Sequence, residues 1–419
     1  MFEFYAFYEV LMNLKKKISW LTDNSYAFFM IFAFLSFYYN VPGVLRQALW
    51  VLLFILNLKY VKIESQMDKI VMFYFLSSLL TLSGNIIIPY PLGNFIKVFI
   101  YSYVPVIFYF IGKYRYSEYT TFMNRSNIGI MFLFILGFYF LLFPTDIYIT
   151  KSLEALNLHG HYTEDTLELA RFSSFMDSYH TANLGICSLC FSFGLLKYSN
   201  ISHFKRPNFM KFVSILFIVI SLVAILLARQ RVAMYIGFLI FAYFLFNCGL
   251  KKRIIFAIVV PLIIGGVCYL MSSIDDVFLE QITKNFSKKA SSTLFSDRSN
   301  QWLEAIDGFC QAPLCGLGVG SSGHVALMSN PNHPIVTDGS YFKILVEGGI
   351  ITFIPFVLIL GFSFLKAYKY RRKYYIECPL LFFFGCSLLG ANVIDMPYII
   401  LFMWYIIGRI NSKNSYAYE

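Results

Sequence analysis

Residues 212–246 read FVSILFIVISLVAILLARQRVAMYIGFLIFAYFLF, two long apolar runs separated by a short basic turn. A helix needs about 20 predominantly apolar residues to cross the hydrocarbon core of a bilayer. Each run approaches that length, and the charged residues of the stretch, Arg229 and Arg231, both lie in the turn. The stretch therefore predicts a pair of membrane helices.

The same pattern recurs from end to end of the chain. Of its 419 residues, 58% are hydrophobic and only 14% are charged, whereas a soluble domain carries about 25% charged residues. We therefore predict an all-α polytopic integral membrane protein with about twelve transmembrane helices, forming a single membrane domain over residues 1–419. The candidate spans are 26–39, 45–61, 70–88, 95–111, 128–143, 182–196, 212–228, 232–246, 254–271, 341–365, 379–393 and 397–410.

The positive charges lie between the apolar runs. The net charge is +11, and basic clusters occur at residues 15–17, 251–253 and 371–373, in alternate connections. This is the pattern of cytoplasmic loops, and it argues against a nucleic-acid partner. It predicts a multi-pass protein with both termini in the cytoplasm.

Two connections are long, and both fall on the predicted extracytoplasmic side. They cover residues 145–180 and 272–340. Long loops in a compact protein are usually functional, so we expect any chemistry on that face.

Arginines at the predicted outer surface are candidate anion contacts. Arg229 and Arg231 are either ordinary snorkelling side chains or phosphate ligands, a task for which arginine is well suited. Arg171 precedes a span, close to Asp177 and His180. It is either part of a salt bridge in the loop or an anion contact.

The second long loop contains a predicted surface helix and a glycine-rich segment. In DRSNQWLEAIDGF (297–309), Trp302, Ala305, Ile306 and Phe309 have helical spacing, which is typical of an amphipathic helix at a membrane surface. Trp302 suits an interfacial belt or stacking on a sugar ring. The glycines of PLCGLGVGSSGH (313–324) allow close backbone approach.

The sequence DGSYFKILVEGG (338–349) enters a predicted span. Glu347 within this apolar stretch is costly unless it is paired or hydrated, and Lys343 is a possible partner four residues earlier. Cys310 and Cys315, in the same predicted external loop, are either disulfide-bonded or free.

The order of these motifs resembles that of the Wzy-type O-antigen/polysaccharide polymerases and the related O-antigen ligases. Ligases usually have histidine where this chain has Asp338, which favours a polymerase. The resemblance is carried by Arg298, Trp302, Ala305, Pro313, Gly316, Gly318, Gly320, Asp338, Gly339, Ser340, Tyr341, Phe342, Leu345, Glu347 and Gly349.

The resemblance implies a GT-C-like, metal-independent glycosyltransferase without a cofactor. It would join oligosaccharide units carried on undecaprenyl diphosphate into O-antigen or capsule, at the outer face of the bacterial cytoplasmic (inner) membrane. Asp338 is the first candidate for the catalytic base, followed by His333 and Glu347. The expected diphosphate and sugar ligands are Arg171, Arg229, Arg231, Arg298, Trp302 and Tyr341.

Partners and alternatives follow from the same comparison. Expected partners are the lipid-linked oligosaccharide and membrane lipid, with a chain-length regulator and a flippase as partners by family analogy. The alternative functions are an O-antigen ligase and a polysaccharide or lipid transporter (flippase). Transporters commonly show internal repeats and polar residues at mid-membrane depth, whereas this chain has no clear repeat and its polar candidates lie at the span ends.

Overall fold

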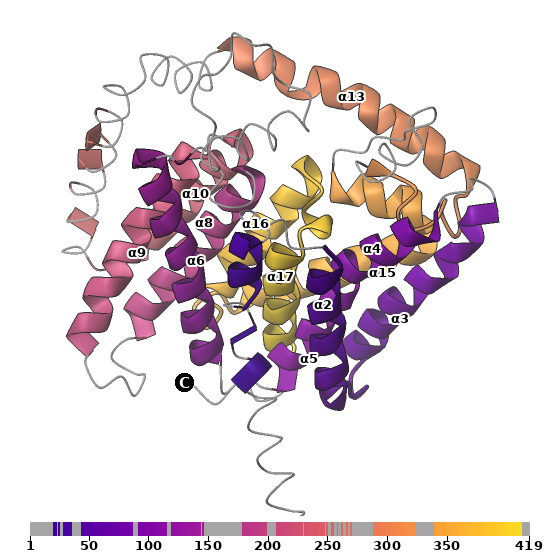
Figure 1. Cartoon of the computed structure of the whole chain (residues 1–419), viewed down its shortest axis with the longest axis horizontal. Coiled ribbons are helices and arrows are strands. Elements are labelled where there is room, and N and C mark those ends of the chain that lie inside the picture. The colour runs from indigo at the N-terminus through magenta and orange to yellow at the C-terminus, as the bar shows by residue number, and fades with distance from the viewer. Residues whose placement is uncertain are drawn as a thin grey trace, which may run out of the picture.

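A computed structural model describes residues 20–22, 24–25, 28–35, 43–86, 91–114, 119–143, 178–198, 207–228, 230–247, 288–323 and 339–412, with isolated positions at 145, 249 and within 253–269. All regular secondary structure in these ranges is helical (Figure 1). The helices are α2 (Gly43–Asn57), α3 (Gln66–Leu80), α4 (Leu92–Ser102), α5 (Ile107–Tyr114), α6 (Tyr119–Leu142), α8 (Ser178–Tyr198), α9 (Pro207–Leu227), α10 (Arg231–Phe246), α13 (Lys288–Gln311), α15 (Ser340–Lys369), α16 (Glu377–Gly390) and α17 (Pro397–Ile410). Four short 3₁₀ helices are also described: η1 (Leu58–Tyr60) after α2, η2 (Thr81–Ile86) after α3, η3 (Val104–Val106) between α4 and α5, and η6 (Val393–Asp395) between α16 and α17.

The helices are those of an integral membrane protein. Within the described residues, five segments are long and apolar enough to cross a bilayer: Gly43–Tyr60, Leu92–Tyr114, Phe122–Phe140, Pro207–Leu227 and Ser340–Lys369. Shorter apolar helices cover Arg231–Phe246, Glu377–Gly390 and Pro397–Ile410. The prediction of an all-α polytopic membrane protein is confirmed in this form. The number of about twelve spans and the GT-C-like architecture stay predictions.

Helix α17 lies at the centre of the bundle (Figure 1) and is buried along nearly its whole length. A helix that is hydrophobic all round belongs in such a position. Two glycines let α17 and α5 touch backbone to backbone. A Cβ atom at Gly408 would come within 1.9 Å of the Tyr109 carbonyl oxygen, and one at Gly112 within 2.1 Å of the Tyr405 carbonyl oxygen. Small residues at such crossings are typical of packed membrane helices.

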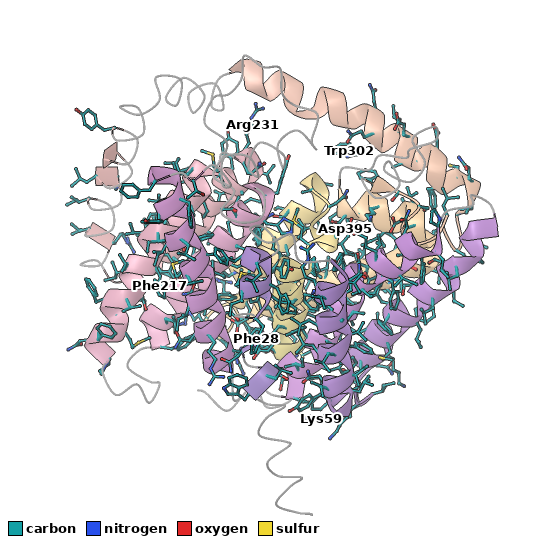
Figure 2. The ribbon with its side chains drawn as sticks, in the orientation of Figure 1. Phe28, Lys59, Phe217, Arg231, Trp302 and Asp395 are labelled. Atoms are coloured by element: carbon teal, nitrogen blue, oxygen red, sulfur yellow. The ribbon has the colours of Figure 1, made fainter. Side chains whose placement is uncertain are left out.

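Helix α13 lies across one end of the bundle (Figure 1), which we call the α13 end. The predicted helix containing Trp302 is thereby confirmed. Ala305 is buried, whereas Leu303 and Ile306 are exposed. Figure 2 places Arg231 and Trp302 at the α13 end, Lys59 at the opposite end and Asp395 between them.

Helix α15 is broken at Gly349, where φ is 57° and ψ is −167°. The break releases backbone groups that the segment after α13 then satisfies. Leu317 N–H donates to the Val346 carbonyl at 2.8 Å, and Ile350 N–H donates to the Pro313 carbonyl at 2.9 Å. Irregular backbone at membrane depth is tolerated where protein covers it, and here the glycine-rich segment supplies that cover.

Candidate functional site

A largely buried charge network links α15 to η6. Lys343 Nζ is 2.8 Å from Asp395 Oδ2 and 3.2 Å from Glu347 Oε1. The Ser102 hydroxyl donates to Asp395 Oδ1 at 2.9 Å. The predicted pairing of Lys343 with Glu347 is confirmed, and Asp395 joins it as a second carboxylate. We call Lys343, Glu347 and Asp395 the charge network.

Local helix geometry and the hydrogen bonds of one serine, Ser340, bring the network together. Lys343 and Glu347 are one helical turn apart on α15, so their side chains share a face. Asp395 comes from η6, which the start of α15 holds in place. The Ser340 hydroxyl donates to the Ala391 carbonyl at 3.0 Å and accepts from Ile394 N–H at 3.1 Å.

The glycine-rich segment forms one wall of the network. The Ser322 hydroxyl and backbone N–H donate to Glu347 Oε1 at 3.0 and 3.3 Å, and Lys343 Nζ donates to the Ser322 carbonyl at 3.4 Å. Gly316 has a φ of 73°, and a Cβ atom there would lie 2.4 Å from the Glu347 carbonyl carbon. The predicted close approach of this segment is confirmed, and its target is α15 itself.

The members of the network differ in their access to solvent. The side chains of Lys343 and Glu347 are 2% and 3% exposed, whereas that of Asp395 is 28% exposed. Burying a charge is expensive unless it is paired and hydrogen-bonded, and both buried members meet that condition. Two carboxylates share one ammonium group, and Asp395 is the member of the network that reaches solvent.

The remaining predicted site residues fall in three groups. Tyr341 is half-buried and its hydroxyl donates to the Gly385 carbonyl at 3.3 Å. Trp302 stacks on Phe342 of α15, with ring centroids 5.2 Å apart. Arg231 is half-buried at the start of α10. Asp338, His333, Arg171, Arg229 and the side chain of Arg298 lie outside the described residues.

Arg298 is placed by its backbone on α13, one turn before Trp302. Residues four apart on a helix lie on one face, and Trp302 stacks on α15. The Arg298 backbone therefore lies on the same side of α13 as the residue that docks on α15.

Asp395, Ser102 and Ser322 were absent from the candidates predicted from sequence. The stretch ANVIDMPYII (391–400) does carry a signal, because Asp395 is an acidic residue in the short connection between two apolar runs. An ionisable residue at such a boundary is a site hypothesis by default. Arg46, in the first turn of α2 beside Tyr398, was also missed.

Cys310 and Cys315 are both free, which settles the choice left open by the sequence. Among the described residues, no group of three or more His, Cys, Asp or Glu side chains is arranged to hold a metal ion.

Comparison with known proteins finds two partial similarities. Residues 216–357 match the Wzy_C family model, described as O-antigen ligase. An O-antigen polymerase of Salmonella muenchen is 26% identical over 247 residues, which are 55% of this chain and 56% of that relative. The chain thus aligns with about half the length of the relative. These matches show that part of the chain is similar to the Wzy-type polymerase/ligase family.

The Wzy_C match covers the second half of α9, then α10, α13, the glycine-rich segment and the first half of α15. It therefore includes Arg231, Trp302, Lys343 and Glu347. Asp395 lies beyond the matched residues, so the fold connects the Wzy_C region to the carboxylate of η6.

Proposed function

We propose that this protein is a polysaccharide polymerase that joins oligosaccharide units carried on undecaprenyl diphosphate. The growing chain is transferred from its lipid diphosphate to a hydroxyl of the incoming lipid-linked unit. The active site faces the extracytoplasmic side of the cytoplasmic membrane and is built at the α13 end.

The reaction forms one bond and breaks one. The acceptor hydroxyl oxygen bonds to the anomeric carbon of the donor, and the bond from that carbon to the diphosphate oxygen breaks. The diphosphate leaves with the lipid, and the hydroxyl proton passes to a base. The main electrostatic need is positive charge around the leaving diphosphate, because charge develops there in the transition state.

Arginines supply that charge in this proposal. Arg231 lies at the α13 end (Figure 2), and Arg298 belongs to the helix that crosses it. Arg171 and Arg229 complete the proposed clamp. Arginine binds phosphate oxygens in a bidentate manner, so a metal ion is not needed to neutralise the leaving group.

Asp338 is the proposed base, with His333 second. It directly precedes Gly339, whose N–H donates to the Asn392 side chain at 3.2 Å. The backbone next to Asp338 is therefore tied to the segment that carries Asp395. Glu347 is held by Lys343 and Ser322. We therefore assign it the role of positioning the glycine-rich segment rather than that of transferring the proton.

The observation that carries the proposal is the charge network itself. A partly exposed carboxylate, Asp395, lies beneath the α13 end, where Arg231 and a stacked tryptophan lie (Figure 2). A sugar hydroxyl needs a hydrogen-bond acceptor and a diphosphate needs cations. This half of the molecule offers both, which supports transfer between two lipid-linked sugars.

A ligase is the second candidate, because the matching family model is described as O-antigen ligase. The two functions share the donor and differ in the acceptor. The replacement of the ligase histidine by Asp338 and the name of the Salmonella relative favour polymerisation.

Deleting the gene in its native host separates the candidates. For a polymerase, the deletion leaves single repeat units attached to the surface, and the wild-type gene restores a ladder on a polysaccharide gel. Full-length polymer accumulating on the lipid carrier would instead identify a ligase. An unaltered ladder would contradict both functions.

The arginine clamp has its own test. Arg298→Ala is expected to reach the membrane in normal amounts and to restore no ladder, because the leaving diphosphate loses a cation. Arg371→Ala is the matched control, since this exposed arginine follows α15 at its far end, and it is expected to restore the ladder fully. A normal ladder from Arg298→Ala would contradict the clamp.

A further inference from the structure

A ridge of apolar side chains runs along one face of α15 and ends in a lysine. Residues four apart on a helix lie on the same face, and this spacing joins Ile354, Leu358, Phe362 and Lys366. The three apolar members are 50%, 39% and 51% exposed, respectively. They belong to a segment that is long and apolar enough to cross a bilayer, so the ridge faces the hydrocarbon of the membrane.

The ridge has about the length of one leaflet. Ile354 and Lys366 are twelve residues apart, which is about 18 Å along an α-helix. One leaflet is half of the hydrocarbon core, or about 15 Å. A phospholipid whose acyl chain lies along the ridge therefore has its phosphate at the height of Lys366.

Lys366 lies among other cations at the end of the bundle opposite α13. Lys113, near the end of α5, and Lys373, in the turn after α15, are close enough for their charges to act on its ammonium group. The Tyr114 hydroxyl, beside Lys113, donates to the Lys62 carbonyl at 3.2 Å, just beyond η1 at that end (Figure 2). Three ammonium groups are thus gathered at the end of the ridge.

Two buried carboxylates at this end are already bound to other donors. Asp68 accepts from Lys113 Nζ at 2.6 Å and from two backbone N–H groups at 2.7 and 2.8 Å. Glu377 accepts from Arg409 Nε at 2.6 Å. Within the part of the chain that the structure describes, the Lys366 ammonium has no hydrogen-bond or ion-pair partner.

The position of Lys366 therefore requires an anion from outside the described chain. A half-buried charge beside other cations is unfavourable unless it is paired. Snorkelling explains a lysine at the end of a membrane helix, but it does not supply the negative charge. The local sequence KAYKYRRKYYI (366–376) has five basic residues and no acidic one. Basic clusters at the ends of membrane helices bind anionic lipid headgroups.

We propose that Lys366 binds the phosphate of an anionic phospholipid, of the phosphatidylglycerol class, whose acyl chain lies along the ridge. Lys373 and Lys113 raise the positive potential around that phosphate. A lipid fits better than a free phosphate because the apolar ridge leads directly to the lysine. The site lies at the opposite end of the bundle from the proposed active site and does not depend on the polymerase reaction.

Native mass spectrometry of the full-length protein in a neutral detergent measures the binding of single lipid molecules. The protein is titrated separately with phosphatidylglycerol and with phosphatidylcholine of the same acyl chains, which differ in headgroup charge. The neutral detergent removes the surface potential of a membrane, so only cations next to the lipid contribute. The wild type is expected to bind phosphatidylglycerol roughly tenfold more tightly than phosphatidylcholine. Equal binding of the two lipids would overturn the proposal.

Substitutions on α15 locate the site. Lys366→Gln is expected to weaken phosphatidylglycerol binding about fivefold, the effect of one basic residue, and to leave phosphatidylcholine binding unchanged, whereas Lys366→Arg keeps both. Lys369→Gln is the matched control, because Lys369 is exposed and its ammonium lies over the Tyr370 ring, 5.5 Å from the centroid. It is expected to bind as the wild type does. Equal weakening by the two glutamine variants would reflect net charge alone and would contradict the site.

Two further measurements complete the test. Millimolar inorganic phosphate is expected to leave phosphatidylglycerol bound, and its complete displacement of the lipid would identify a site for a free anion and overturn the lipid proposal. Phosphatidylglycerol is also expected to raise the unfolding temperature of the wild type, because a ligand that binds the folded state stabilises it. This shift needs no variant, and an equal shift with phosphatidylcholine would contradict the proposal even if Lys366→Gln failed to fold.

Discussion

At the residue scale, Lys343 is the one cation that lies between Glu347 and Asp395 in the part of the chain that the structure describes. Replacing it with methionine keeps most of the volume and leaves one carboxylate buried at 3% exposure beside a second at 28%. Removing one partner of a buried ion pair typically costs about 3–5 kcal/mol. Lys343→Met is therefore expected to lower the free energy of unfolding by about that amount, measured by thermal unfolding of the detergent-purified protein.

The double variant Lys343→Met with Glu347→Gln tests the cause. Neutralising Glu347 removes the buried charge that Lys343 compensates, so the double variant is expected to be more stable than Lys343→Met alone. Substitutions of residues in contact have coupled effects on the free energy of unfolding, whereas the effects of distant substitutions are additive. If the two losses simply sum, the network is not an electrostatic unit and its role in the site must be reassigned.

At the element scale, the break in α15 and the segment after α13 depend on each other, because the segment packs directly against the broken turn. Gly349 has a φ of 57°, and a Cβ atom there would lie 2.3 Å from the Leu314 carbonyl oxygen. Strained backbone of this kind costs about 1–3 kcal/mol for a residue with a side chain, and the collision adds to that. Gly349→Ala is therefore expected to lower thermal stability and to raise the reactivity of Cys315 as the segment lifts.

Gly361 provides the matched control for this prediction on the same helix. A Cβ atom there would meet nothing within 4 Å, and alanine is favoured over glycine in a helix by up to about 1 kcal/mol. Gly361→Ala is expected to leave Cys315 reactivity unchanged and stability equal or higher. Equal effects from the two alanines would mean that the segment does not depend on the break.

The elements were largely predictable from sequence, because each span is a local apolar run. The last predicted span, 397–410, coincides with α17 (Pro397–Ile410). The run 95–111 is divided into α4 and α5 by η3, since Pro105 lacks the N–H that a continuous helix requires. Apart from Pro105, the apolar residues of this run give no sign that the helix is divided there.

The site was predictable only where it is local. Lys343 and Glu347 are one turn apart, so helix geometry alone pairs them. Asp395 meets Ser102 across 293 positions of sequence, and that contact depends on how α4, α15 and η6 pack. Asp338 and His333, which the family resemblance named, lie outside the described residues, so their roles stay predictions.

At the scale of the whole molecule, the two ends differ in charge chemistry. The end that carries Lys59 (Figure 2) also holds the Lys113–Asp68 ion pair, at 2.6 Å. By the positive-inside rule we expect this end to face the cytoplasm and the α13 end to face out. A membrane-impermeant maleimide applied to intact spheroplasts is therefore expected to label Cys310, which is exposed on α13, and Cys310→Ser is expected to remove that signal.

A cysteine at the opposite end completes the topology test. Lys59→Cys replaces an exposed lysine of η1 and is expected to be labelled only after the spheroplasts are permeabilised. Both positions are exposed, so a difference between them reports the side of the membrane rather than burial. Labelling of Lys59→Cys in intact spheroplasts, with Cys310 silent, would invert the protein. The diphosphate clamp would then face the cytoplasm, where an extracytoplasmic polymerase cannot act.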